Sequence, residues 1–163
     1  MENLFLFLLT WSVYMPIYIV YHSPFNLFRK ADNFAEFFSK KFLRGALVLA
    51  FLSVPFNFNG NVFTVMGSAK GKSVYSLFSP YQMAEVHALS IFGALHQKAG
   101  ENSAVIFGAA GYQNSGKSSL VGFGAAGYQN ATESADPGLL TFYQKVGEQD
   151  RLFALWSKLE AKR

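Results

Sequence analysis

The residues whose types and spacing most clearly suggest a chemical role lie at positions 111–118, where the chain reads Gly-Tyr-Gln-Asn-Ser-Gly-Lys-Ser. This segment satisfies the G-x-x-x-x-G-K-S pattern, in which backbone amides cradle phosphates and the lysine reaches the terminal ones. Gly111, Gly116, Lys117 and Ser118 are therefore candidate nucleotide-binding residues. The segment also belongs to a repeated sequence, and no apolar strand ending in Asp follows it to hold Mg²⁺. Nucleotide binding is for these reasons the last of the functional alternatives.

Other patterns that carry chemistry are missing from the sequence. The chain has no cysteine, and its three histidines (His22, His87 and His96) show no metal-ligand spacing. Positions 61–163 carry nine Lys/Arg against seven Asp/Glu, which is no basic footprint for nucleic acid. We therefore expect no enzyme, no metal, no cofactor and no nucleic-acid partner.

The back half of the chain is a tandem repeat. The eight residues 107–114 recur without change at 123–130, an offset of 16. A tyrosine or histidine followed by glutamine occurs five times, at positions 81–82, 96–97, 112–113, 128–129 and 143–144. Such periodicity indicates stacked units that share a core, and we assign the repeat region to residues 70–150.

Each unit can be interpreted as a helix or as a strand. Apolar residues at i, i+3, i+4 and i+7, with capping residues at both ends, favour short helices. The sequence thus predicts a mainly α fold with tandem repeats. The alternative is a β-solenoid or β-meander, in which Tyr stacks on Tyr and Gln on Gln in ladders that satisfy the amides. In the tail, residues 151–163, the spacing of Leu152, Leu155, Trp156 and Leu159 predicts an amphipathic helix.

The front of the chain is apolar. The whole sequence is 51% hydrophobic and 15% charged, and positions 3–28 carry no charge at all. A membrane-spanning helix needs about 20 predominantly apolar residues, so we predict one at about 3–21 and possibly a second at 45–63. Residues 1–69 then form a membrane-associated region, and the protein is expected to be an integral membrane protein.

A basic segment, residues 29–44, separates these two stretches. Helical spacing of its phenylalanines predicts an amphipathic helix, which either lies at a bilayer surface or packs on neighbouring parts of the chain. The positive-inside rule places it in the cytoplasm, with the repeat region extracytoplasmic if 45–69 crosses. Its expected lipid-facing cations are Arg29, Lys30, Lys40, Lys41 and Arg44.

These features predict a membrane-anchored repeat protein with a structural or protein-interaction role, a component of a membrane complex. Its partners are the lipid bilayer and a protein partner or further copies of the chain. Aromatic side chains dominate interface energetics, so the expected contact residues are Tyr75, Tyr81, Tyr112, Tyr128 and Tyr143. For these tyrosines, the alternative is that they pack in the core. The alternative is a pore-forming or membrane-perturbing protein, because ten apolar residues suffice for a barrel strand.

Overall fold

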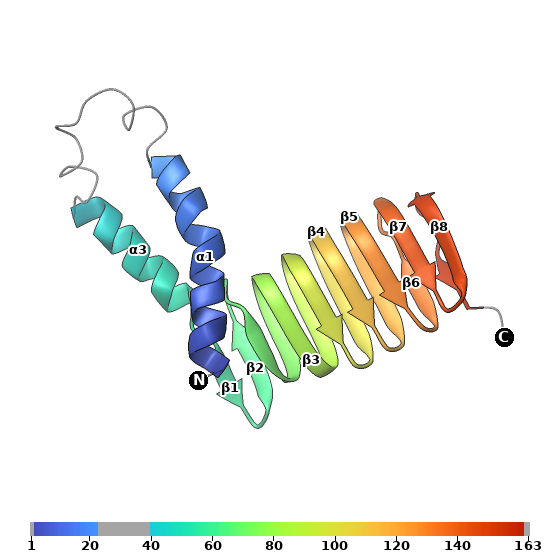
Figure 1. The fold of residues 1–163 in the computed structure, drawn as a ribbon, viewed down its shortest axis with the longest axis horizontal. Helices are drawn as coiled ribbons and strands as arrows, with labels where there is room; N and C mark the ends of the chain where they lie inside the picture. The colour runs from blue at the N-terminus through green and yellow to red at the C-terminus, as the bar shows by residue number, and fades with distance from the viewer. Residues whose placement is uncertain (1, 23–39, 162–163) are drawn as a thin grey trace.

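Figure 1 shows the computed structural model, which describes residues 2–22 and 40–161. Within these residues, two helices, α1 (Glu2–His22) and α3 (Lys40–Ser53), precede a β-solenoid of about five turns. The prediction of a mainly α fold is therefore wrong, and the repeat units are strands. Figure 1 shows the coils following one another along a single axis, with α1 beside the first coils.

Nine strands form one sheet that winds around the solenoid. They are β1 (Phe56–Phe58), β2 (Asn61–Thr64), β3 (Ala69–Ala99), β4 (Asn102–Ser115), β5 (Ser118–Ala131), β6 (Ser134–Asp136), β7 (Leu140–Val146), β8 (Gln149–Ala154) and β9 (Leu159–Glu160). Most neighbours pair in parallel, and β4 and β5 align with the 16-residue offset of the repeat, Tyr112 opposite Tyr128. Each sequence unit is thus one coil.

The glycines of the repeat and the hydrogen bonds between coils explain why these units are strands. Each interior glycine costs a helix about 1 kcal/mol relative to alanine. In the solenoid the same glycines allow neighbouring coils to approach closely, since a Cβ added at Gly124 would lie 1.6 Å from the carbonyl oxygen of Gly108. Local capping signals favoured helices, but the hydrogen bonds that decide the fold come from the next coil, 16 residues away.

The interior of the solenoid is narrow and filled by small side chains. Buried columns run along the axis, for example Val105 beside Val121 and Ala110 beside Ala126. Alanine, serine and valine fill most of this space, and the largest side chains that are fully buried are glutamines. The large aromatic residues of the repeats therefore lie outside the core.

Both ends of the solenoid differ from its middle. At the N-terminal end, β1 and β2 form an antiparallel hairpin whose turn, Asn59-Gly60, has positive φ at both residues, as tight hairpin turns require. At the C-terminal end, β8 pairs antiparallel with β7, and β9 pairs antiparallel with β6. The predicted amphipathic helix at 151–163 is therefore wrong for the described residues. Phe153 and Trp156 have positive φ, which interrupts any helix there.

The predicted membrane spans are also corrected. Over the described residues, neither helix combines the length and the apolar character that a bilayer crossing requires. The span predicted at 45–63 is divided between α3, β1 and β2. The prediction of an integral membrane protein fails with these spans.

Part of α1 is buried against the solenoid, while its exposed side chains include Leu4, Phe5, Leu8 and Ile17. Thr10 is fully buried, and its hydroxyl oxygen accepts a hydrogen bond from the backbone N–H of Ser68 at 2.8 Å. Tyr14 is buried and lies against Phe78 of β3, with ring centroids 6.1 Å apart. Burial raises the pKa of Tyr14 well above its usual value. One face of α1 therefore packs on the solenoid.

The basic segment 29–44 lies mostly outside the described residues, which begin again at residue 40. Arg29 and Lys30 fall in the undescribed part, while Lys40, Lys41 and Arg44 belong to α3, where Arg44 is exposed. The cytoplasmic position predicted for this segment depended on a membrane span, and the extracytoplasmic position of the repeat region depended on a second one; both fall with the predicted spans.

Candidate interaction surface

A ladder of buried glutamines supports the coils from inside. Gln82, Gln97, Gln113, Gln129 and Gln144 are all fully buried. Each Nε2 after the first donates a hydrogen bond to Oε1 of the glutamine before it, at distances of 2.6, 2.9, 3.0 and 3.3 Å. Each also donates to a backbone carbonyl, as Gln113 does to Leu120 at 3.2 Å. The amide ladder that the strand interpretation anticipated is thus present.

The residue before each glutamine forms a second column, outside the first. Tyr81, His96, Tyr112, Tyr128 and Tyr143 stack face to face, with ring centroids 4.8 to 5.1 Å apart. The structure thus brings four of the five predicted contact tyrosines together, with His96 among them. Within this stack each ring covers the face of its neighbour, so the inner rings offer a partner mainly their edges.

Two groups in this stack have altered titration. Burial, assisted by the positive charge of Lys98, lowers the pKa of His96 and favours its neutral ring. At the C-terminal end, the Tyr143 hydroxyl donates a hydrogen bond to a carboxylate oxygen of Asp150 at 3.0 Å, which raises the tyrosine pKa.

Tyr75 lies apart from the stack. Its ring stacks on Phe63 of β2 at 5.1 Å and lines a shallow apolar depression of about 330 Å³ near the N-terminal end. Phe56, Leu77, Leu89 and Ile91 line the same depression. The fifth predicted contact residue therefore belongs to a different surface.

Sequence reasoning missed a row of exposed phenylalanines. Phe107 and Phe123 stack at 5.6 Å and are 50% and 66% exposed. Further exposed apolar side chains lie on the neighbouring coils, namely Phe92, Leu95, Leu139 and Phe142. No charged residue occurs at 103–113 or 119–129. Monomeric proteins rarely expose contiguous apolar patches larger than a few hundred Å², so this surface has the character of an interface. The recurrence of Phe107 as Phe123 in the next repeat was the sequence feature that could have indicated this row.

The charges of the coils gather instead at the turns between strands. Lys117 in the turn between β4 and β5 forms an exposed ion pair with Glu101, which lies in the turn one coil earlier, with Nζ and Oε1 3.1 Å apart. Glu133 is the exposed acid of the next turn. The coils thus have a charged edge at these turns and an uncharged surface between them.

This arrangement also places the candidate nucleotide-binding residues. Gly111 lies inside β4, Gly116 and Lys117 form the turn, and Ser118 begins β5. The Ser118 hydroxyl shares a hydrogen bond with that of Ser134 at 3.0 Å, and Lys117 holds Glu101. The segment is thus two strands and a turn, whereas a phosphate-binding loop runs from a strand into a helix N-terminus. Over the described residues, no group of three or more His, Asp or Glu side chains could hold a metal ion.

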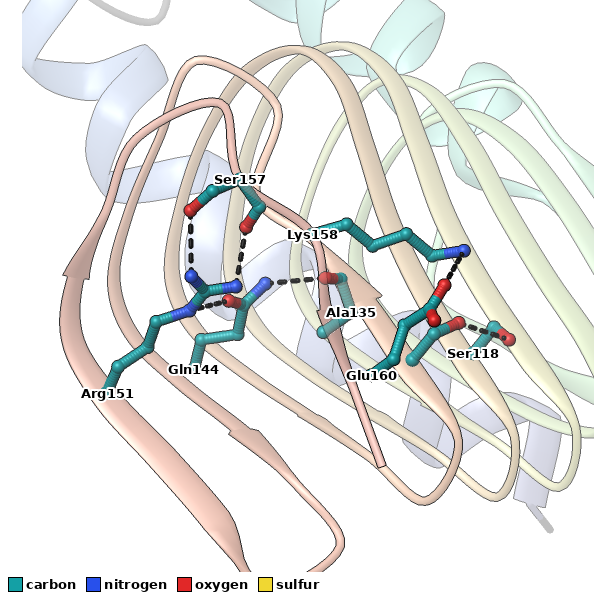
Figure 2. Close-up of polar contacts among 8 residues, drawn as sticks. Ser118, Ala135, Gln144, Arg151, Ser157, Lys158 and Glu160 are labelled. Atoms are coloured by element: carbon teal, nitrogen blue, oxygen red, sulfur yellow. Dashed lines mark hydrogen bonds and ion pairs between the residues drawn. The ribbon is translucent and has the colours of Figure 1, made fainter. Parts of the chain in front are cut away.

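The C-terminal end holds a short anchored loop (Figure 2). Arg151 donates from Nε to Oε1 of Gln144 at 2.8 Å, and from its two terminal nitrogens to the hydroxyl and carbonyl oxygens of Ser157 at 2.8 and 2.6 Å. Lys158 pairs with Glu160 nearby at 2.8 Å. The segment so fixed, which we call the cap loop, comprises residues 152–156, that is, the last three residues of β8 and the two that follow it. Its exposed apolar side chains are Leu152, Phe153, Leu155 and Trp156.

Comparison of the chain with protein-family models, with curated proteins and with solved structures finds no match.

Proposed function

We propose that this protein is a structural, protein-interaction module that presents one uncharged, aromatic side of a β-solenoid to a protein partner. The observation that carries the proposal is the row of exposed phenylalanines headed by Phe107 and Phe123. Aromatic enrichment with depletion of charge is the composition that distinguishes the centre of protein interfaces from other surfaces.

The solenoid suits such a role because its exposed rows are held at a fixed spacing. Continuous parallel pairing between coils and the buried glutamine ladder leave the strands little freedom to slide. Large side chains on stacked coils are therefore ordered before a partner binds, which lowers the entropy cost of binding.

The distribution of charge agrees with the same orientation. The ion pair of Lys117 with Glu101 and the exposed Glu133 lie at the turns. A partner that covers the phenylalanine row has no need to desolvate these groups, and burying an ion pair is expensive. The charged turns then stay in water when the aromatic side is covered.

Site-specific photo-crosslinking tests this proposal. A photoreactive phenylalanine analogue placed at position 123, in cells that express the full chain, is expected to give discrete protein adducts after irradiation. The same analogue at position 133, on the charged edge, is the matched control and is expected to give few. Equal labelling at both positions, or none at position 123, would contradict the proposal.

The cap loop favours a second candidate function, membrane perturbation. Leu152 and Trp156 are 77% and 76% exposed, and Trp is common where proteins meet the interface of a bilayer. Release of a trapped dye from vesicles of neutral or anionic lipid tests this function. Leakage that disappears in the variant Leu152→Ser/Trp156→Ser would support it, and intact vesicles at saturating protein would exclude it.

A further inference from the structure

The identical eight-residue repeat creates a step in one exposed column. The strand register aligns Leu95, Gly111, Gly127 and Phe142 on four successive coils. The outer two are large and about half exposed, while the inner two are exposed glycines. We call Gly111 and Gly127 the glycine step.

Neighbouring backbone keeps the step open. A Cβ added at Gly127 would lie 2.7 Å from the carbonyl oxygen of Gly111, and one at Gly111 would lie 2.5 Å from that of Leu95. Real Cβ atoms do not approach backbone oxygens so closely. Neither position of the step can therefore carry a side chain of its own.

Two exposed phenylalanines, which we call the ridge, lie on the same two coils as the step. Phe107 and Phe123 lie on the same two coils as Gly111 and Gly127, four residues earlier in each copy of the repeat. Ala109 and Ala125 lie between ridge and step, and they are small and at least partly exposed. Ridge and step thus span the same two coils with the same spacing, because both are set by the pairing of β4 with β5.

We infer, on the basis of the proposed function, that the partner is a second copy of this chain, which packs its ridge on this step across a two-fold axis. Phe107 then lies over the partner's Gly127, and Phe123 over the partner's Gly111. A two-fold interface requires a self-complementary patch, in which residue i meets j and j meets i. This patch meets that condition, since one element of the pair is convex and the other is flat.

The spacing of the coils favours a second copy over a partner of another fold. Two solenoids with the same distance between coils stay in register over every coil that they share. The available area is also of the right size. The exposed parts of Phe92, Phe107, Phe123 and Phe142 amount to about 450 Å², taking roughly 200 Å² for each ring. Leu95, Leu139 and the alanines between ridge and step bring the surface toward the roughly 800 Å² per partner of a standard interface.

Sedimentation equilibrium of the purified full chain tests the inference. We expect the mass to rise with concentration from 18.1 kDa to twice that value. The variant Phe107→Ser/Phe123→Ser should dissociate at least about 10-fold more readily, as loss of central aromatic residues does. The matched control Leu152→Ser/Leu155→Ser removes comparable apolar surface from the cap loop and should dimerise as the parent does.

Further variants distinguish loss of dimerisation from loss of folding. Ala109→Arg keeps both rings but places a charge between ridge and step, and it should leave a folded monomer by circular dichroism. Because the chain has no cysteine, Ala109→Cys introduces a single thiol, and a short bifunctional thiol reagent should join the thiols of two copies. The same reagent should not join two copies of Glu133→Cys, on the charged edge.

The outcomes separate this inference from the proposed function. A monomer at all concentrations, or a dimer insensitive to Phe107→Ser/Phe123→Ser, overturns the inference of a second copy. If position 123 then still crosslinks to a different protein in cells, the proposed function stands alone. If it crosslinks to nothing, both fail.

Discussion

Arg151 ends the glutamine ladder by donating a hydrogen bond from its Nε to Oε1 of Gln144, 2.8 Å away. Without it, the last buried amide of the solenoid would have no further coil to donate to that oxygen. The terminal nitrogens of the same guanidinium hold Ser157, so one side chain both completes the ladder and fixes the cap loop (Figure 2).

Replacement of Arg151 should therefore destabilise the C-terminal end. We expect Arg151→Ala to lower the free energy of unfolding by about 1.5–3 kcal/mol, because hydrogen bonds that involve a charged group are worth that much. Urea unfolding followed by circular dichroism measures the change. Lys158→Ala, which removes an exposed ion pair close by, is the control and should unfold near the parent midpoint. Equal effects of both substitutions would show that Arg151 is no cap.

Breaking the ladder in the middle should cost more than removing a polar contact at the surface. Gln113→Leu leaves Oε1 of Gln97 without its ladder donor and Nε2 of Gln129 without its ladder acceptor. Each buried polar group without a partner costs about 1–3 kcal/mol, so we expect a loss of at least about 2 kcal/mol. Gln149→Leu is the comparison, since its amide bonds only to the exposed Glu160 carbonyl. The prediction fails if the two variants have the same urea midpoint.

Stability should depend on pH through His96. Its folded-state pKa is lowered, mainly by burial and also by Lys98, so below the ordinary value of about 6.5 the unfolded chain binds more protons than the folded one. The contribution of His96 is then fully present above about pH 7 and decreases as the pH falls through 6.5 toward the lowered pKa. Thermal unfolding between pH 5 and 8 tests this dependence.

The variant His96→Tyr supplies the control for that experiment. It places in the second coil the residue that the other coils carry, and it removes the titrating group. We expect a flatter pH profile and a melting temperature at pH 5.5 above that of the parent. An unchanged profile would assign the pH dependence to other groups.

Lys117 is expected to have a structural role at the turns and no part in nucleotide binding. Its ammonium faces Glu101 across one coil spacing, and both side chains are partly exposed. Exposed pairs of this kind contribute about 0–1 kcal/mol, so Lys117→Ala should change stability little. Titration with a fluorescent ATP analogue should show no saturable binding in either protein. Binding by the parent that Lys117→Ala abolishes would restore the nucleotide hypothesis.

The repeat and its period could be derived from the sequence. The recurrence of 107–114 at 123–130 fixed the coil length, and the ring-Gln pairs placed one unit on each coil. The uncharged stretches of each unit are also visible in the sequence, because charge is a property of single residues, but the exposed row of phenylalanines on them was missed. The Tyr and Gln columns followed as soon as the units were stacked as strands.

Only the tertiary structure decided between helix and strand. A helix satisfies its hydrogen bonds within four residues, so its signals, such as capping residues, are local. The strands of this solenoid find their partners 16 residues away, and that gain does not show in any short window. Long-range contacts also matter at the N-terminus, where Thr10 and Tyr14 of α1 contact Ser68 and Phe78, which are distant in the sequence. The size of each side chain can be seen in the sequence, but which residues face the core depends on how each coil packs on the next.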